Sequence, residues 1–450
     1  MFYQLIVNNN MYWAHAMSHD LIHWEDLPIA LYPGRDYRCW SGGTCVDGDR
    51  VIAMFYGQPE GIMVATSSDP MLLNWETVQR EAVIPLESIP KAPADGFTVP
   101  DPFVWKEDGK YFALVGGITA HPVSGDKFPQ MYLYTSTDLH NWEYEKGFLS
   151  SAEFCEADDD GACPYFMPIG DKRIIMHYSH RHGTRYILGE YDSKTYNFTP
   201  VNGGAISRDC WFGGVHAPSI FPVGEDIVAM FNINCSQWPV TDDNMMMVLP
   251  RIYTLSGSNK TELSVNVTEN VESLRGKHTR LENITVSANS EFCIDEIRGR
   301  AMEIIAVIKP DKIPVFEMKV LCSADDSEYT KIQFYPRRGD RCCRVEDRSV
   351  WKLRENHKST IVIDASHGSL RGDIIPAPPA REDVYIDSSD NIKLRVFIDN
   401  SIVEVYVNDR ATAAIRTYPT RADADRIKFY SRGRDAEILT LDAWEMKSIF

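Results

Sequence analysis

The sequence predicts an all-β protein, a five-bladed β-propeller followed by a C-terminal β-sandwich, and three observations support this fold class. A phrase that begins with Ser, continues with Asp and ends in Trp-Glu occurs at residues 18–25, 67–76 and 136–143. Pairs of strand-like runs joined by polar Gly turns recur through the first 250 residues. After about residue 276 this repeat stops and short alternating strands follow. Repeats near the length of a propeller blade indicate radially arranged sheets.

Each repeat contains a predicted hairpin, because two apolar runs flank a short turn rich in Gly and Asp. The second runs lie at 51–57, 110–117, 173–180 and 226–232, and the runs before them at 40–46, 101–105, 163–167 and 217–221. Residues 2–4 fit the second strand of an earlier unit, which gives five units, and the first unit lacks its innermost strand. The repeated tryptophans are predicted to be structural and to fill the wedge between blades. They are Trp24, Trp75 and Trp142, with Phe198 at the corresponding place in the fourth unit.

The predicted domain boundaries follow from where the repeat ends. Residues 1–250 form the propeller, 251–280 a linker and 281–450 the sandwich, whose strands are short and bounded by turn residues. Within the sandwich, residues 394–409 are expected to form a hairpin that turns near Asn400, and the proline-rich stretch 374–383 a loop.

Composition narrows the classes of partner. The 450 residues carry a net charge of −18, which argues against a nucleic-acid backbone or an anionic membrane as partner, whereas a neutral sugar is compatible. No apolar run is long enough for a transmembrane helix. No signal peptide is visible at the N-terminus, so secreted and cytoplasmic locations both stay open. The ten cysteines show no metal-binding spacing, which favours reduced thiols, and no cofactor is expected. A homo-oligomer is compatible with the sequence.

Two stretches together resemble glycoside hydrolase family 32, the β-fructofuranosidases. The first runs from FYQ at 2–4 through MYWAHAMSHDLIHWEDLPIAL at 11–31 to CWSGG at 39–43. The second is LRVFIDNSIVEVYVND at 394–409, followed by RTYP at 416–419. The resemblance covers nearly the whole chain and implies retaining hydrolysis of terminal β-fructosyl bonds, with acidic residues contributed by three blades.

The resemblance locates one of these acids clearly. Asp101 corresponds to the family's Arg-Asp-Pro aspartate, which holds the fructosyl hydroxyls and stabilises the transition state, although Pro100 replaces the arginine. The alternative is that Asp101 is a simple turn residue. The family's nucleophile block precedes FYQ, and this sequence has no position there, so the nucleophile is expected to lie upstream or to be lost. The resulting expectation is a chain that binds sugar and releases little fructose.

The acid/base glutamate of the family aligns with Ala162, in the phrase before Cys163-Pro164. Nearby acids are therefore candidate substitutes, with Asp160 first and Asp159 and Glu156 as alternatives. Mutual repulsion within this acidic run is expected to raise the pKa of one member, as a general acid requires. The alternative is a solvated acidic loop.

Substrate-binding candidates follow from the same matches and from the predicted funnel of inner strands. The resemblance assigns sugar contacts to Gln4, Trp13, Trp40 and Ser41, and Tyr56 and His216 are expected to line the same funnel, where aromatic faces and a few polar groups orient a sugar. Trp40 has a core position as its alternative. The pair His180 and His182 is interpreted as a polar strand end and not as a metal site, since no third ligand accompanies it.

The sequence leaves three functional hypotheses. The first is a β-fructofuranosidase-like glycosidase that acts on a small-molecule or oligosaccharide substrate. The second is a non-catalytic carbohydrate-binding protein on the same scaffold, because fold alone does not determine function. The third is a five-bladed glycosidase with another sugar specificity, such as an arabinosidase.

Overall fold

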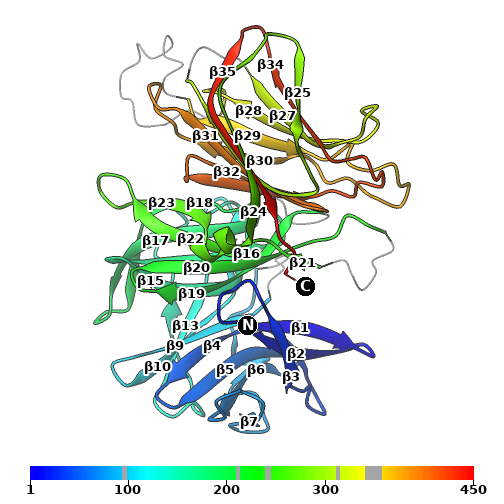
Figure 1. The fold of residues 1–450 in the computed structure, drawn as a ribbon. Coiled ribbons are helices and arrows are strands. Elements are labelled where there is room, and N and C mark those ends of the chain that lie inside the picture. The colour runs from blue at the N-terminus through cyan, green and yellow to red at the C-terminus, as the bar shows by residue number, and fades with distance from the viewer. Residues whose placement is uncertain (94–98, 209–212, 239–244, 311–314, 340–356, 450) are drawn as a thin grey trace. The chain divides into compact units, whose positions relative to one another are not determined.

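The computed structural model describes residues 1–93, 99–208, 213–238, 245–310, 315–339 and 357–449. Strands occupy most of these ranges (Figure 1). The helices described there are two short 3-10 turns, η1 (Leu86–Ser88) and η2 (Glu269–Leu274). In the described part of the chain no helix has the length and apolar character needed to cross a bilayer. The prediction of an all-β protein is therefore confirmed.

The chain divides into two compact units. The first comprises Met1–Ala205 and Ala217–Ile227, and the second Ile206–His216 and Val228–Phe450. The second strands of the four predicted hairpins are β5 (Arg50–Gln58), β10 (Lys110–Val115), β16 (Lys172–Ser179) and β20 (Asp226–Ile233). The strands before them are β4 (Arg38–Asp47), β9 (Pro102–Glu107), β15 (Ala162–Ile169) and β19 (Val215–Val223). All eight predicted strands are present.

Five small antiparallel sheets follow one another along the first part of the sequence. The first is three-stranded, in the order β1 (Phe2–Val7), β2 (Asn10–Met17) and β3 (Glu25–Leu31). The second has the order β4-β5-β6-β7 with β8 beside β6, where β6 is Gly61–Ser67, β7 Glu76–Thr77 and β8 Ile84–Pro85. The first sheet thus has fewer strands than the second, as the repeat pattern predicts.

The next three sheets repeat the pattern. The third has the order β14-β13-β10-β9, with β13 at Tyr132–Ser136 and β14 at Glu143–Gly147, and a separate ribbon pairs β11 (Ile118–Ala120) with β12 (Lys127–Pro129). The fourth is β15-β16-β17-β18, with β17 at Gly183–Asp192 and β18 at Asn197–Ala205. The fifth is β19-β20-β22-β23 with β21 beside β20, where β21 is Met246–Met247, β22 Arg251–Ser256 and β23 Glu262–Val267.

The repeated tryptophans close a turn in each of the first three sheets. The indole N–H of each donates to the carbonyl of the leucine three residues earlier, and each leucine has a positive φ. The pairs are Trp24 with Leu21 (3.1 Å, φ 65°), Trp75 with Leu72 (2.7 Å, φ 54°) and Trp142 with Leu139 (3.0 Å, φ 69°). The Asp of each phrase accepts backbone N–H groups of the same turn. The role is structural, and the hydrogen bond stabilises a left-handed residue that would otherwise be unfavourable.

The two sheets after β23 contain six strands each. One has the order β24-β35-β26-β31-β32-β33 and the other β25-β34-β27-β28-β29-β30. The strands are β24 (Arg275–Val286), β25 (Glu291–Arg298), β26 (Ala301–Ile308), β27 (Phe316–Cys322), β28 (Thr330–Tyr335), β29 (Ser359–Asp364), β30 (Ala380–Val384), β31 (Ile392–Asp399), β32 (Ile402–Val407), β33 (Ala411–Arg416), β34 (Arg426–Ser431) and β35 (Ala436–Met446). Alternate residues of both sheets form one apolar core, as in a β-sandwich.

The sandwich confirms one local prediction and corrects another. Strands β31 and β32 pair Leu394 with Val407 and turn through Asn400, whose φ is 49°, so the predicted hairpin is present. The stretch 374–383 was expected to be a loop, but its last residues belong to β30, which pairs with β29 at the edge of its sheet. An edge strand tolerates the preceding prolines because its outer N–H groups need no partner. Residues 251–280, expected to be a linker, contain β22, β23, η2 and the start of β24.

Candidate active site

The carboxyl group of Asp101 lies buried at the start of β9, with 2% of the residue exposed. Its backbone is fixed because the Asp101 carbonyl accepts a hydrogen bond from Gly116 N–H at 3.0 Å. One side-chain oxygen, Oδ2, accepts from the backbone N–H of Cys163 at 3.1 Å and from its thiol at 3.3 Å. The other oxygen, Oδ1, is buried without a hydrogen-bond partner among the described residues. A buried acceptor of this kind is costly unless a ligand or water uses it.

A bulge in β15 directs Cys163 toward this carboxyl. Ala162 pairs with Tyr178, but the next paired residue is Tyr165, so the register shifts between them. Cys163 has a φ of +46° and Gly161 a φ of +63°. A non-glycine residue in this region is strained, and bulges commonly redirect a residue at a functional site. Here the bulge brings the N–H and S–H of Cys163 to the same oxygen of Asp101.

Burial controls the ionisation of Asp101. Desolvation raises the pKa of Asp101 to about 6, while the hydrogen bonds from Cys163 and the charge of His180 act in the opposite direction. Desolvation, followed by the Asp101 charge, raises the pKa of the partly buried Cys163 thiol well above the ordinary value. The thiol is therefore a neutral donor, and Asp101 can exchange a proton near neutral pH, as catalytic carboxyl groups do.

Asp160 and His180 form a second polar pair beside this carboxyl. His180 Nδ1 lies 2.6 Å from Asp160 Oδ2, and the backbone N–H of His180 donates to Asp160 Oδ1 at 2.9 Å. The side chain of Asp160 is 4% exposed and that of His180 28%. Burial opposes protonation of His180, but the hydrogen bond and charge of Asp160, together with the charge of Asp101, outweigh it and raise the pKa of His180. Asp160 thus holds an imidazole near Asp101.

The remaining acids of the run are paired with a different cation. Asp159 is fully buried, and its Oδ2 lies 3.6 Å from Arg185 Nε and accepts from Glu156 N–H at 3.2 Å. The Glu156 carboxylate lies 3.3 Å from the other end of the same guanidinium, with 47% of its side chain exposed. Both carboxylates therefore share one basic partner, the guanidinium of Arg185. The expected mutual repulsion within this run remains a prediction.

Polar candidates from the first two sheets reach the same place. Gln4 Nε2 donates to Ser41 Oγ at 3.0 Å, and Ser41 also interacts with the Cys163 thiol. Burial, followed by the charge of the nearby Asp101, raises the pKa of Tyr56. The structure thus brings Gln4, Ser41 and Tyr56 together with Asp101 in the first unit. Their role as sugar contacts remains a prediction.

The two tryptophan candidates are less accessible. Trp13 is 4% exposed, packs against Phe55 in an apolar cluster and donates its indole N–H to the Trp40 carbonyl at 2.7 Å. Trp40 is half-buried and packs against a second apolar cluster, and its own indole N–H has no hydrogen-bond partner in the described ranges. His216 belongs to the second unit. The assignment of Trp13, Trp40 and His216 to sugar binding likewise remains a prediction.

Three residues of the site were not assigned to it from the sequence. They are Cys163, His180 and Tyr165. Tyr165 is partly buried, its hydroxyl lies 3.3 Å from Ser219 Oγ, and it lies near Asp101 and Cys163; desolvation raises its pKa to about 12. His180 was interpreted as a strand end, and it lies directly after β16 in the turn before β17. The signal for His180 was the antiparallel pairing of β15 with β16, which places it opposite Asp160.

Metal and thiol chemistry have no further support in the described ranges. No three His, Cys, Asp or Glu side chains are grouped there in a way that could hold a metal ion. His182 bonds to the Ala157 carbonyl at 3.0 Å. The cysteines described are all free thiols: Cys39, Cys45, Cys155, Cys163, Cys235, Cys293 and Cys322.

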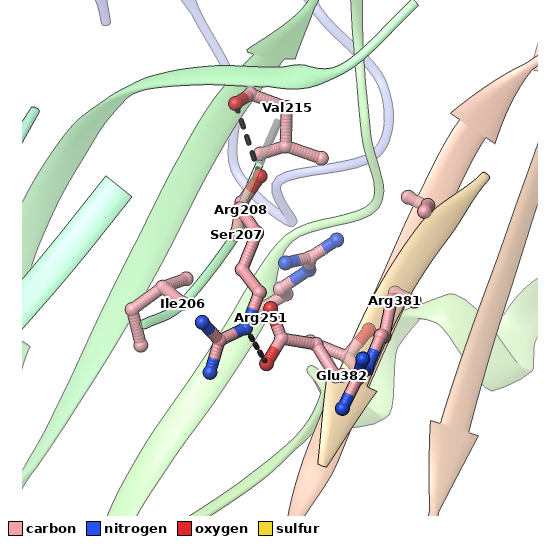
Figure 2. A pocket seen from close by; sticks show the side chains of 11 residues that line it. Ile206, Ser207, Arg208, Val215, Arg251, Arg381 and Glu382 are labelled. Carbon is pink, nitrogen blue, oxygen red and sulfur yellow. Dashed lines mark hydrogen bonds and ion pairs between the residues drawn. The ribbon is translucent and has the colours of Figure 1, made fainter. Parts of the chain in front are cut away.

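A polar pocket lies within the second unit, and Figure 2 shows the side chains that line it. It is lined by Arg208, Arg251, Arg381 and Glu382, and Arg208 Nε lies 3.7 Å from Glu382 Oε2. The guanidinium of Arg251 is buried and paired with Glu404 at 3.1 Å. None of the predicted site residues lines this pocket.

The sequence matches two family models. Residues 1–229 match the glycosyl hydrolases family 32 N-terminal domain, and residues 270–445 the glycosyl hydrolases family 32 C-terminal domain. The chain belongs to glycosyl hydrolase family 32. The resemblance stated from its motifs is thereby confirmed, and the family is one of glycosidases.

Relatives and solved structures agree with this membership. The chain is 26% identical over 536 residues to beta-fructofuranosidase, insoluble isoenzyme CWINV6, of Arabidopsis thaliana, covering 99% of this chain and 91% of the relative. It is 24% identical over 457 residues to sucrose-6-phosphate hydrolase of Zymomonas mobilis, covering 92% and 79%. Fructan 1-exohydrolase IIa of Cichorium intybus, solved with 1-kestose, has a TM-score of 0.80 at 20% identity, covering 99% and 92%. The family 32 chain is therefore a five-bladed β-propeller followed by a β-sandwich.

Proposed function

We propose that this family 32 chain is a glycosidase that hydrolyses terminal β-fructosyl bonds of sucrose or fructans. The observation that carries the proposal is the carboxyl of Asp101. It lies in the family's Asp-Pro position, is buried, and has a pKa raised by desolvation to about 6. Family membership and the names of relatives support the class of substrate, since those relatives are a beta-fructofuranosidase and a sucrose-6-phosphate hydrolase.

The chemistry expected of Asp101 is that of a sugar-binding and charge-stabilising group. Its Oδ1 is a buried acceptor without a partner in the described chain, so a sugar hydroxyl can donate to it. Its Oδ2 is fixed by Cys163, which keeps the carboxyl in one orientation. When the anomeric carbon gains positive charge in the transition state, a buried carboxylate nearby stabilises it more than water would.

Two substitutions favour a second candidate function, a non-catalytic carbohydrate-binding protein. Ala162 stands where the family resemblance expects the acid/base glutamate, and it is fully buried. Pro100 stands where an arginine is expected. A chain with these changes keeps Gln4, Ser41 and Asp101 for sugar contact, while its rate of glycosidic hydrolysis is lowered. A five-bladed glycosidase for another sugar is the third candidate.

Sugar-release assays separate the three candidates. The 450-residue protein is incubated with sucrose, 1-kestose, inulin, levan and arabinan, and free fructose and arabinose are measured. Fructose release that Asp101→Asn abolishes supports the proposal. Binding of these sugars by calorimetry without release supports the binding protein, and arabinose release supports the third candidate.

A further inference from the structure

We propose that His180, oriented by Asp160, is the catalytic residue that donates a proton to the leaving group, at a site where Ala162 replaces the acidic residue that the family resemblance predicts. This inference rests on the proposed function and names a residue for its acid step. Its basis is the geometry around β15 and β16. Ala162 pairs with Tyr178, so the same antiparallel register places Asp160 opposite His180, beyond the ends of both strands.

The carboxylates of the acidic run are poorly placed to donate the proton themselves. Both oxygens of Asp160 are used by His180, one by the ring Nδ1 at 2.6 Å and one by the backbone N–H at 2.9 Å. Asp159 is fully buried and paired with Arg185. Glu156 is paired with the same guanidinium. The imidazole of His180 combines partial exposure, 28% of its side chain, with an orientation fixed by Asp160.

The groups that face His180 keep it protonated and in place. Asp160 accepts from Nδ1, and Asp101, at the start of β9, contributes a second negative charge nearby. The ring of Tyr178 packs edge-on against the imidazole, with centroids 5.1 Å apart. Arg181, the next residue, lies 3.9 Å from Asp158. A carboxylate bound to one imidazole nitrogen fixes the tautomer and stabilises the imidazolium, as in other histidine-dependent catalysts.

The proton step balances without any further reagent. The proton on Nε2 of the imidazolium passes to the glycosidic oxygen as the bond between that oxygen and the anomeric carbon breaks. The bonding electron pair stays on the oxygen, which leaves as a hydroxyl group. Water then adds to the fructosyl group, and the neutral imidazole accepts a proton from that water, which restores the imidazolium.

The test compares two substrates that differ in their need for a proton. Sucrose needs protonation of its leaving group, whereas the nitrophenolate of 4-nitrophenyl β-D-fructofuranoside leaves without it. We expect His180→Gln to lower kcat for sucrose about 100-fold or more, the contribution usual for general acid catalysis, and to lower kcat for the aryl substrate less than about 10-fold. His182→Gln, in the same turn and bonded to Ala157, is the matched control and is expected to leave both rates unchanged.

A second variant provides a readout that a structural role would not change. Asp160→Asn removes the charge that raises the pKa of His180, so the alkaline limb of the kcat/KM profile should move to lower pH. This measurement also tests the role of His180 if the His180→Gln variant does not fold. Three results would overturn this inference without affecting the proposed function. His180→Gln could lose the same activity on both substrates or retain full sucrose hydrolysis, or the alkaline limb could stay in place in Asp160→Asn. A wild-type chain that hydrolyses neither substrate would overturn the proposed function as well.

Discussion

Replacement of Asp101 by asparagine should stabilise the protein at neutral pH while removing its activity. The pKa of Asp101 is about 6 in the folded chain, against 3.8 ordinarily, because burial disfavours the charged form. Below pH 3.8 both folded and unfolded chains hold the proton. Between pH 3.8 and pH 6 only the folded chain holds the proton, so the free energy of unfolding falls as pH rises. Above pH 6 both chains have released the proton, and the full cost of burying the charged carboxylate is present. A difference of about two pH units corresponds to about 3 kcal/mol.

The expected gain for Asp101→Asn at pH 7.5 is therefore about 1–3 kcal/mol, after about 1 kcal/mol is allowed for a weaker hydrogen bond from Cys163. Urea unfolding at pH 7.5 and at pH 4.5 measures it, and the gain should shrink at the lower pH. Asp47→Asn is the control of opposite sign. Lys106, followed by Tyr111, lowers the pKa of Asp47 to about 2, so that variant should lose stability at pH 7.5. Destabilisation of Asp101→Asn by the same amount at both pH values would refute the reasoning.

Three further predictions concern contacts in both units. Cys163→Ala removes the thiol donor from the buried carboxyl, so the acid limb of the activity profile should move to higher pH. Trp75→Phe loses the indole hydrogen bond to Leu72, which should cost about 1 kcal/mol in urea unfolding, and an unchanged midpoint would reject the turn-closing role. Arg251→Met leaves the Glu404 carboxylate buried without its cation, so a loss of about 3–5 kcal/mol is expected in calorimetry; the double variant with Glu404→Leu should recover much of it.

Much of the fold could be predicted from the sequence because strand signals are local. Alternating apolar residues and Gly-Asp turns located both strands of each predicted hairpin. The three-stranded first sheet also followed from the repeat, since residues 2–4 matched a second strand. The edge strand β30 was missed because the prolines before it gave a loop signal, and whether proline is tolerated depends on which strand edge is free.

Only those residues of the candidate site that lie in a recognisable sequence motif could be predicted. Asp101 lies in such a motif, and its burial follows from its place before an inner strand. The roles of Cys163 and His180 depend on a bulge and on the pairing of β15 with β16, neither of which a single strand reveals. The ion pair of Asp159 with Arg185 could not be predicted either, because the two residues are distant in the sequence and only the fold brings them together.

The pH dependence of kcat/KM for fructose release from sucrose tests the central claim most directly. If Asp101 and His180 act together, the profile is bell-shaped. Its acid limb should lie near pH 6, set by Asp101, and its alkaline limb above pH 6.5, set by His180. Asp101→Asn should abolish the release. A profile whose acid limb lies near pH 4, or fructose release that persists in Asp101→Asn, would contradict the account.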